Sequence, residues 1–138
     1  MNPLRIALVI LLAQLAIGGT VQADPFEAGI ARGCITPPLP FWLTGYAART
    51  HPAPIVRSDL WAKALALRDA RGHRAVVLTT DLIGLPAEIT DTVAQRLEHR
   101  HGLRRSDVLF SSSHTHSGPV VWPNLQVLFD FDAAEQAR

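Results

Sequence analysis

The stretch AVVLTTDLIGLPAEITDTVAQRLEHRHGLRRSDVLFSSS, residues 75–113, decides the predicted fold. It begins with apolar and β-branched residues at 75–80, a run typical of a strand that is covered on both faces. The next segment, 86–100, has a proline at its start, early acidic residues and an apolar residue at every fourth position, and Gly102 follows it. These features predict an α-helix. A further strand is predicted at 107–112, and the order strand, helix, strand predicts a parallel pair with a right-handed crossover.

Another strand pattern lies upstream, at residues 60–69, just before the turn-forming residues 69–72. Two strands so close together predict an antiparallel hairpin. The predicted fold class is therefore α/β: a partial mixed sheet with a β-hairpin and a right-handed βαβ unit. Residues 36–54 are rich in proline and aromatic side chains and predict an ordered loop region, which either covers the core or forms part of a substrate wall.

The N-terminal residues 1–23 have the pattern of a secretory signal peptide: Arg5, then an apolar run, then a small residue at Ala23. The alternative is an uncleaved membrane anchor, but the run is interrupted by Gln14 and is short of the roughly 18–20 residues that a span needs. We therefore predict a secreted or periplasmic protein whose mature part is 24–138. That part has 12 basic and 12 acidic residues and no basic cluster, which argues against a nucleic-acid partner.

The sequence has a single cysteine, Cys34, so no internal disulfide can form. Cys34 lies in an apolar stretch between Gly33 and Ile35. A free cysteine usually behaves as a small apolar side chain, so we expect a buried structural thiol rather than a nucleophile.

Two histidines, His114 and His116, follow the last predicted strand in the string SSSHTHSGP, residues 111–119. In an extended segment, residues two apart lie on the same face, about 6.6 Å from each other, so both rings can converge on one centre. Neutral imidazole is a common zinc ligand, and a metal site and a solvated strand end both remain open on spacing alone. Asp81 follows the neighbouring strand and is expected beside His114, either as a carboxylate that fixes the histidine tautomer or as a loop aspartate.

Four segments of the sequence resemble the N-terminal part of the neutral/alkaline non-lysosomal ceramidase family. They are AGIARGCITPP (28–38), GYAART (45–50), LWAKALALRDARGHRAVVLTTDLIGLP (60–86) and SSSHTHSGP (111–119). The last of these is the most specific. The sequence departs from the family pattern at Cys34, where the family usually has an aspartate.

The resemblance implies a zinc-dependent amidohydrolase that cleaves the amide of N-acylsphingosine (ceramide) to a fatty acid and a sphingoid base. It implies His114 as a zinc ligand and His116 as a catalytic residue beside the metal. The family's other zinc ligands and a catalytic serine come from later in its chain, so we expect 24–138 to be an incomplete N-terminal portion of a larger α/β hydrolytic domain. A metallohydrolase for another amide or ester and a non-catalytic fragment are the alternatives.

A ceramide-like substrate also implies an apolar binding slot and a possible peripheral contact with a membrane surface. The aromatic residues that are candidates for the slot are Phe41, Trp42, Tyr46 and Trp122.

Overall fold

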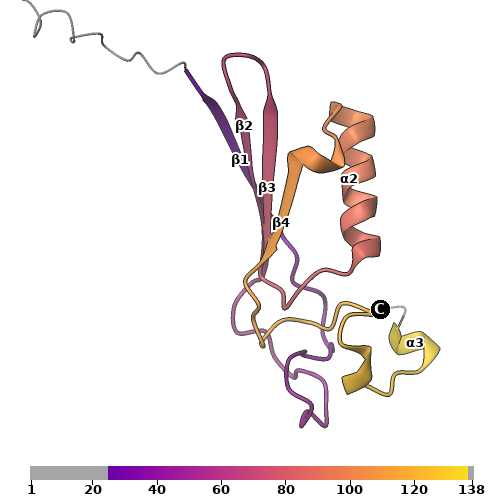
Figure 1. Cartoon of the computed structure of the whole chain (residues 1–138). Coiled ribbons are helices and arrows are strands. Elements are labelled where there is room, and N and C mark those ends of the chain that lie inside the picture. Colours follow the sequence, from indigo (N-terminus) through magenta and orange to yellow (C-terminus); the bar gives the residue numbers. More distant parts are fainter. Residues whose placement is uncertain (1–24, 137–138) are drawn as a thin grey trace, which may run out of the picture.

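The computed structural model describes residues 25–136 and contains one four-stranded sheet in the order β1-β2-β3-β4 (Figure 1). The strands are β1 (Glu27–Cys34), β2 (Trp61–Arg68), β3 (Arg74–Thr80) and β4 (Val108–Ser112). The helical elements are α2 (Ala87–His101), η1 (Arg105–Asp107), η2 (Gln126–Leu128) and α3 (Ala133–Gln136). The predicted signal peptide, residues 1–23, lies outside the described residues. No helix within 25–136 has the length and apolar character needed to cross a membrane.

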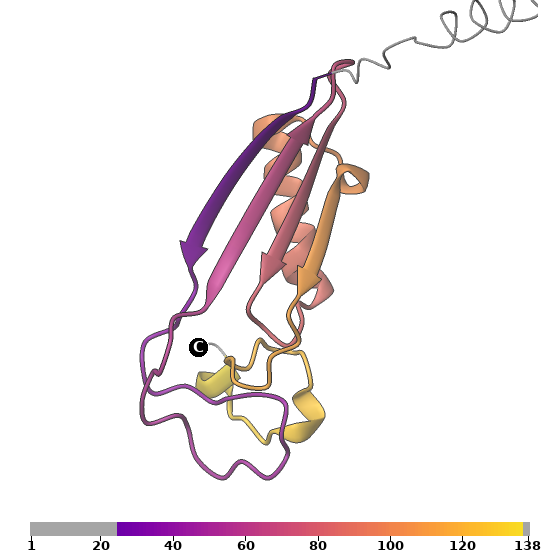
Figure 2. The same cartoon turned by 90° about the vertical axis from the view of Figure 1, so that its left-hand side faces the viewer.

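The predicted hairpin and βαβ unit are confirmed. β2 pairs with β3 in an antiparallel ladder, and β3 pairs with β4 in a parallel one, from Val76 opposite Val108 to Thr80 opposite Ser112. In Figure 2, β3 and β4 both end at the same end of the sheet, where the long loops gather. Ligands of open α/β sheets collect at such carboxyl ends.

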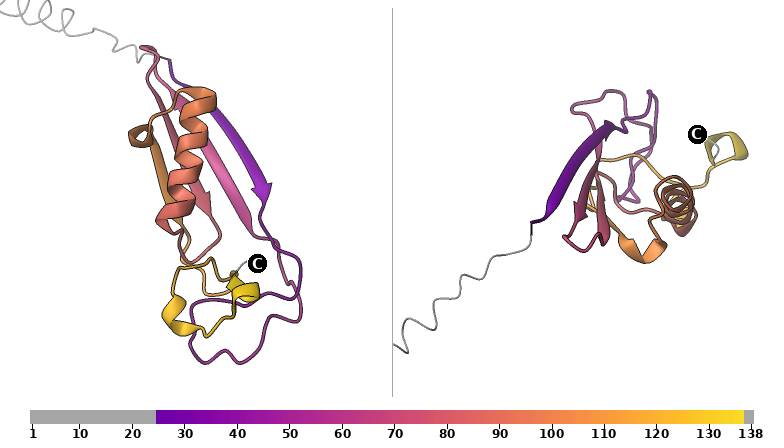
Figure 3. Two further views of the ribbon diagram at one scale, coloured as in Figure 1. Left: turned by 90° about the vertical axis from the view of Figure 1, so that its right-hand side faces the viewer. Right: turned by 90° about the horizontal axis from the view of Figure 1, so that it is seen from above.

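Helix α2 begins after Pro86 and ends at Gly102, close to its predicted bounds. Gly102 has φ 64°, and its N–H donates to the carbonyl of Glu98 at 2.8 Å, so the helix ends in a left-handed glycine cap. The helix packs on one face of the sheet (Figure 3). The core on this face consists of Val76, Leu103 and Val108, with Leu78, Leu97 and Phe110 packed around them.

The expectation that β3 is covered on both faces is wrong for the part of the chain that the structure describes. Alternate side chains point away from α2, and the register aligns Ile30, Leu65, Val77 and Leu109 in one row across all four strands. Ile30 is 87% exposed and Leu109 61% exposed. The apolar run at 75–80 predicts a strand with both faces covered. In the structure α2 covers one face of β3, and no described element covers the other.

Strand β1 was not predicted, and Cys34 at its end is exposed rather than buried. All eight residues of β1 are exposed, because it is an edge strand that α2 does not reach (Figure 3). Its sequence EAGIARGC has two glycines and few β-branched residues, so local propensity gives little strand signal. The Cys34 thiol donates to Thr36 Oγ1 at 3.3 Å, in contact with solvent rather than with the core.

Candidate functional site

The site is built where the parallel strands end. The backbone pairing of β3 and β4 continues to their last residues, Thr80 and Ser112. The side chains of these two residues also share a hydrogen bond of 2.9 Å. The N–H of Ser113 then donates to the carbonyl of Thr80 at 2.9 Å. The turns that follow the two strands, residues 81–86 and 113–119, are thereby held side by side.

His114 is fixed by the turn that follows β3. Its Nδ1 lies 2.9 Å from the carbonyl oxygen of Ile83. A carbonyl oxygen accepts only, so Nδ1 carries the proton and donates, and Nε2 of the neutral ring keeps its lone pair. The backbone of His114 has φ 57°, a left-handed conformation that is uncommon for a residue with a side chain and that recurs at functional sites.

The rings of His114 and His116 do converge, with their centroids 5.3 Å apart. The route differs from the prediction, which assumed an extended segment. The left-handed backbone at His114 interrupts the strand, so a turn rather than strand alternation brings the two rings together.

The loop region 36–54 forms a wall of the site beside His116. The loop is fastened to the segment after the histidines by two backbone bonds, from Thr44 N–H to the Gly118 carbonyl (3.0 Å) and from Val120 N–H to the Trp42 carbonyl (2.9 Å). Tyr46 meets the His116 ring edge to face, with centroids 4.8 Å apart. The substrate-wall alternative for this loop is therefore compatible with the geometry.

The other aromatic candidates make ring or backbone contacts with residues other than the two histidines. Trp42 and Trp122 belong to an aromatic cluster with Phe129 and Phe131 near the end of the described chain. Phe41 forms a β-bridge with Ala53.

Of the two alternatives for Asp81, the contacts of its carboxylate favour the loop aspartate. Its Oδ2 accepts a hydrogen bond from the N–H of Trp61 at 2.9 Å and lies 3.8 Å from Nζ of Lys63. The carboxylate therefore fixes the start of β2, and the group that sets the tautomer of His114 is the Ile83 carbonyl. Asp81 was correctly placed at a strand end, but sequence position does not give the direction of its side chain.

The donor set fits one position of a zinc site. His114 offers Nε2 on an exposed ring whose other nitrogen is already bonded, the arrangement that zinc-ligating histidines generally have. Within residues 25–136, no three His, Cys, Asp or Glu side chains lie close enough together to hold a metal ion. The described residues alone therefore do not form a metal site with three such ligands.

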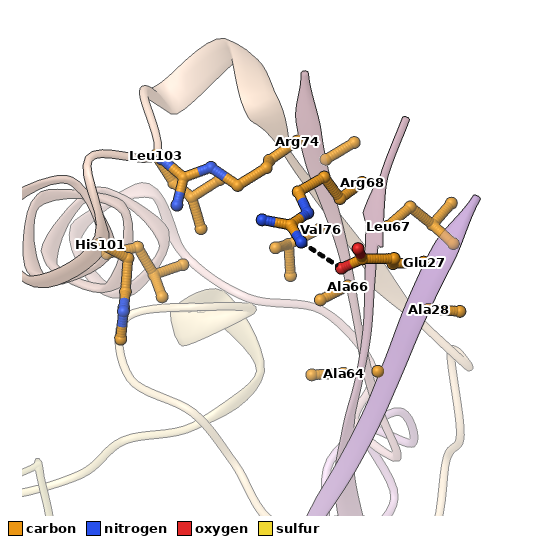
Figure 4. Close-up of a pocket in the computed structure, with 13 residues that line it drawn as sticks. Glu27, Ala28, Ala64, Ala66, Leu67, Arg68, Arg74, Val76, His101 and Leu103 are labelled. Atoms are coloured by element: carbon orange, nitrogen blue, oxygen red, sulfur yellow. Dashed lines mark hydrogen bonds and ion pairs between the residues drawn. The ribbon is translucent and has the colours of Figure 1, made fainter. Parts of the chain in front are cut away.

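A groove of about 510 Å³ lies beside α2, and neither histidine of the pair lines it. Figure 4 shows its floor of small residues from β1 and β2, with the Glu27–Arg68 ion pair, Arg74 and His101 around it. Leu97, Leu103 and Val76 form its wall on the side of the core. Glycine and alanine on the floor of the groove have no reactive side-chain groups. The histidine pair therefore remains the candidate functional site.

Comparison with known proteins decides the family. Residues 26–134 match the family model described as neutral/alkaline non-lysosomal ceramidase, N-terminal. The chain belongs to this family. The resemblance read from the four sequence segments is thus confirmed over nearly the whole described chain, and the ceramidase family is a family of hydrolases.

Individual ceramidases agree at low identity. The neutral ceramidases of Drosophila pseudoobscura pseudoobscura and Drosophila melanogaster are each 27% identical over 118 residues, which cover 83% of this chain and 17% of the relative. The crystal structure of neutral ceramidase from Pseudomonas aeruginosa matches with a TM-score of 0.65 at 26% identity, over 72% of this chain and 16% of that one. A ceramidase complexed with C2 matches with a TM-score of 0.64 at 27% identity, over 70% of this chain and 16% of that one. The chain thus spans about a sixth of the length of these relatives.

Proposed function

We propose that this chain is the N-terminal segment of a secreted, zinc-dependent amidohydrolase that cleaves the amide of a ceramide to a fatty acid and a sphingoid base. The observation that carries the proposal is the orientation of His114. Its Nδ1 is held by the Ile83 carbonyl, which leaves Nε2 free at the carboxyl ends of the parallel strands of a ceramidase-family fold.

His114 is the proposed zinc ligand of this segment. A bound zinc ion would polarise the amide carbonyl and lower the pKa of a bound water to about 7. The left-handed backbone at His114 and the contact with the Ile83 carbonyl hold the ring in one orientation. The ring would therefore lose little conformational freedom on binding a metal ion. The remaining ligands are proposed to come from the part of the family chain outside the matched segment.

His116 is the proposed proton-transfer residue. The Gly45 backbone packs closely against the imidazole near Cγ. An imidazole at this place can take a proton from the attacking water at a ring nitrogen and deliver it to the leaving amine nitrogen. Such a group typically contributes about 10²–10⁴-fold to the rate.

A lipid substrate and a peripheral contact with a membrane surface are also part of the proposal. The segment between β1 and β2 carries the exposed apolar side chains Leu39, Tyr46, Ile55 and Val56, of which Tyr46 contacts His116. Apolar side chains in the segment that contacts a polar reaction centre suit an amphiphile, whose chains need a dry surface while its amide needs donors and acceptors. Secretion rests on the sequence pattern of residues 1–23.

The test combines a zinc titration with a fluorescent-ceramide assay. Both are run on residues 24–138 and on the same segment joined to the remainder of a catalytic domain of this family. The short segment is expected to bind zinc weakly and to be inactive, since a catalytic zinc usually needs three protein ligands. In the longer protein, His114→Ala is expected to remove zinc and activity together.

His116→Ala should retain more zinc than His114→Ala and lose about 10²–10⁴-fold in turnover. His73→Ala, which alters an exposed hairpin histidine, is the matched control and is expected to change neither property. Full activity of His114→Ala would exclude this residue as a ligand. Zinc binding without ceramide cleavage, but with cleavage of another amide or ester, would favour the alternative metallohydrolase.

A further inference from the structure

The His116 ring lies against a residue that can have no side chain. A methyl group at Gly45 would stand 2.5 Å from Cγ of His116 and 2.8 Å from its Cβ and Nδ1. Carbon atoms in contact normally lie about 3.5–4.0 Å apart, so any larger residue at 45 would drive the ring out of its place. Gly45 also has φ 95°, a backbone conformation that strains other residues.

Two neighbours in the same loop hold His116 from other directions. Tyr46 presents its ring edge to face, with an interplanar angle of 74°. The guanidinium of Arg49 donates from Nη2 to the His116 carbonyl at 2.8 Å, and it also lies 5.3 Å from the centre of the Tyr46 ring. The Gly45 backbone and the Tyr46 ring thus contact the imidazole, and the guanidinium fixes the backbone that carries it.

We infer that the segment Gly45–Arg49 is the positioning device of His116: the bare backbone of Gly45 lets the imidazole pack against the loop, Tyr46 contacts the ring, and Arg49 holds the backbone of His116. Gly45, Tyr46 and Arg49 are positioning residues in this role, because each contacts His116. The inference rests on the proposed function for the chemistry of His116. The placement of the ring itself depends on neither zinc nor ceramide.

Gly72 provides a matched control for Gly45. It has φ 84° in the turn between β2 and β3, and a methyl group there would meet no atom within 4 Å. Gly72→Ala therefore measures backbone strain alone and is expected to raise the unfolding equilibrium constant roughly 5–30-fold. Gly45→Ala should raise it a further 5–150-fold, roughly the effect of forcing extra atoms into a packed place.

The double variant Gly45→Ala/His116→Gly separates the two contributions, because glycine removes the Cβ of His116 as well as its ring. If the excess cost at Gly45 comes from the His116 side chain, replacing Gly45 in the His116→Gly background should cost no more than Gly72→Ala. Denaturant unfolding of the full chain gives all of these constants. An equal cost for Gly45→Ala and Gly72→Ala, or an excess that persists without the ring, would overturn the inference.

Nuclear magnetic resonance reports the placement of the His116 ring directly. In the unaltered chain we expect nuclear Overhauser contacts from the Gly45 α-protons to the His116 ring protons. Tyr46→Phe should keep them, because the ring edge remains. Arg49→Met should weaken these contacts, because the His116 carbonyl loses the hydrogen bond from the guanidinium.

The absence of these contacts in the unaltered chain would overturn the inference even if Gly45→Ala did not fold. Neither arm measures zinc or turnover. A failed ceramidase assay therefore leaves the positioning result standing, and a failed positioning result leaves the ceramidase assay standing.

Discussion

Replacing Leu103 by alanine tests how the core meets the groove beside α2. Leu103 is 7% exposed and packs with Val76 and Val108, yet it also lines the groove. The substitution removes three carbons from the interior, and at about 0.8 kcal/mol for each buried methylene the transfer loss is about 2.4 kcal/mol. In closed cores Leu→Ala costs up to about 5 kcal/mol, because a cavity remains.

At Leu103 the cavity contribution should be small. Truncation widens a groove of about 510 Å³ that already exists, and does not leave a sealed void. We therefore expect a loss near 2.5 kcal/mol in the free energy of unfolding, about 10 °C in the melting temperature. Urea unfolding followed by circular dichroism measures it.

Leu109→Ala is the control for this prediction. Leu109 is 61% exposed on the opposite face of β4, so its replacement should change the free energy by less than about 0.5 kcal/mol. A loss above about 4 kcal/mol at Leu103 would mean that the groove closes in solution. A loss below about 1 kcal/mol would mean that Leu103 is not buried, and either result would refute the reasoning.

Three further predictions concern the ends and turns of the sheet. Asp81→Ala should lower the free energy of unfolding by about 1–2 kcal/mol in urea titrations, because the N–H of Trp61 loses its carboxylate acceptor. Gly102→Asn should lower stability less than Gly102→Val, since asparagine tolerates the φ of 64° at the end of α2; thermal unfolding ranks the two. The side-chain hydrogen bond from His73 lowers the pKa of the Asp69 carboxyl, so the contribution of this turn is present above the unfolded-state pKa and is lost as pH falls through the folded one. Amide NMR shifts of the turn against pH, with Asp69→Asn as the control, should report a carboxyl titration below its ordinary value.

The local parts of the fold were predictable, and the parts that depend on distant contacts were not. The β3–α2–β4 unit has strong signals within about 40 residues: an apolar run, a four-residue apolar repeat and a capping glycine. Strand β1 has no such signal, since glycines interrupt it and its strand state depends on pairing with β2. The exposure of Cys34 follows from that edge position.

The candidate site divides in the same way. His114 and His116 were found from their spacing, but the Ile83 carbonyl that orients His114 depends on how two turns pack. Arg49 reaches His116 from 67 positions away, and no local pattern marks it. The direction of the Asp81 side chain was missed for the same reason, because its partner lies at the start of β2.

The two margins of the sheet have a consequence for handling the protein. Within the sheet formed by residues 25–136, β1 and β4 are the edge strands, so each presents along its outer side backbone N–H and C=O groups that this ladder does not use. Such edges are templates for pairing with another chain, and the exposed Ile30 lies on one of them. Concentrated solutions of this chain are therefore expected to aggregate through these edge strands. Ile30→Lys should slow the aggregation, and it leaves the histidine pair unchanged.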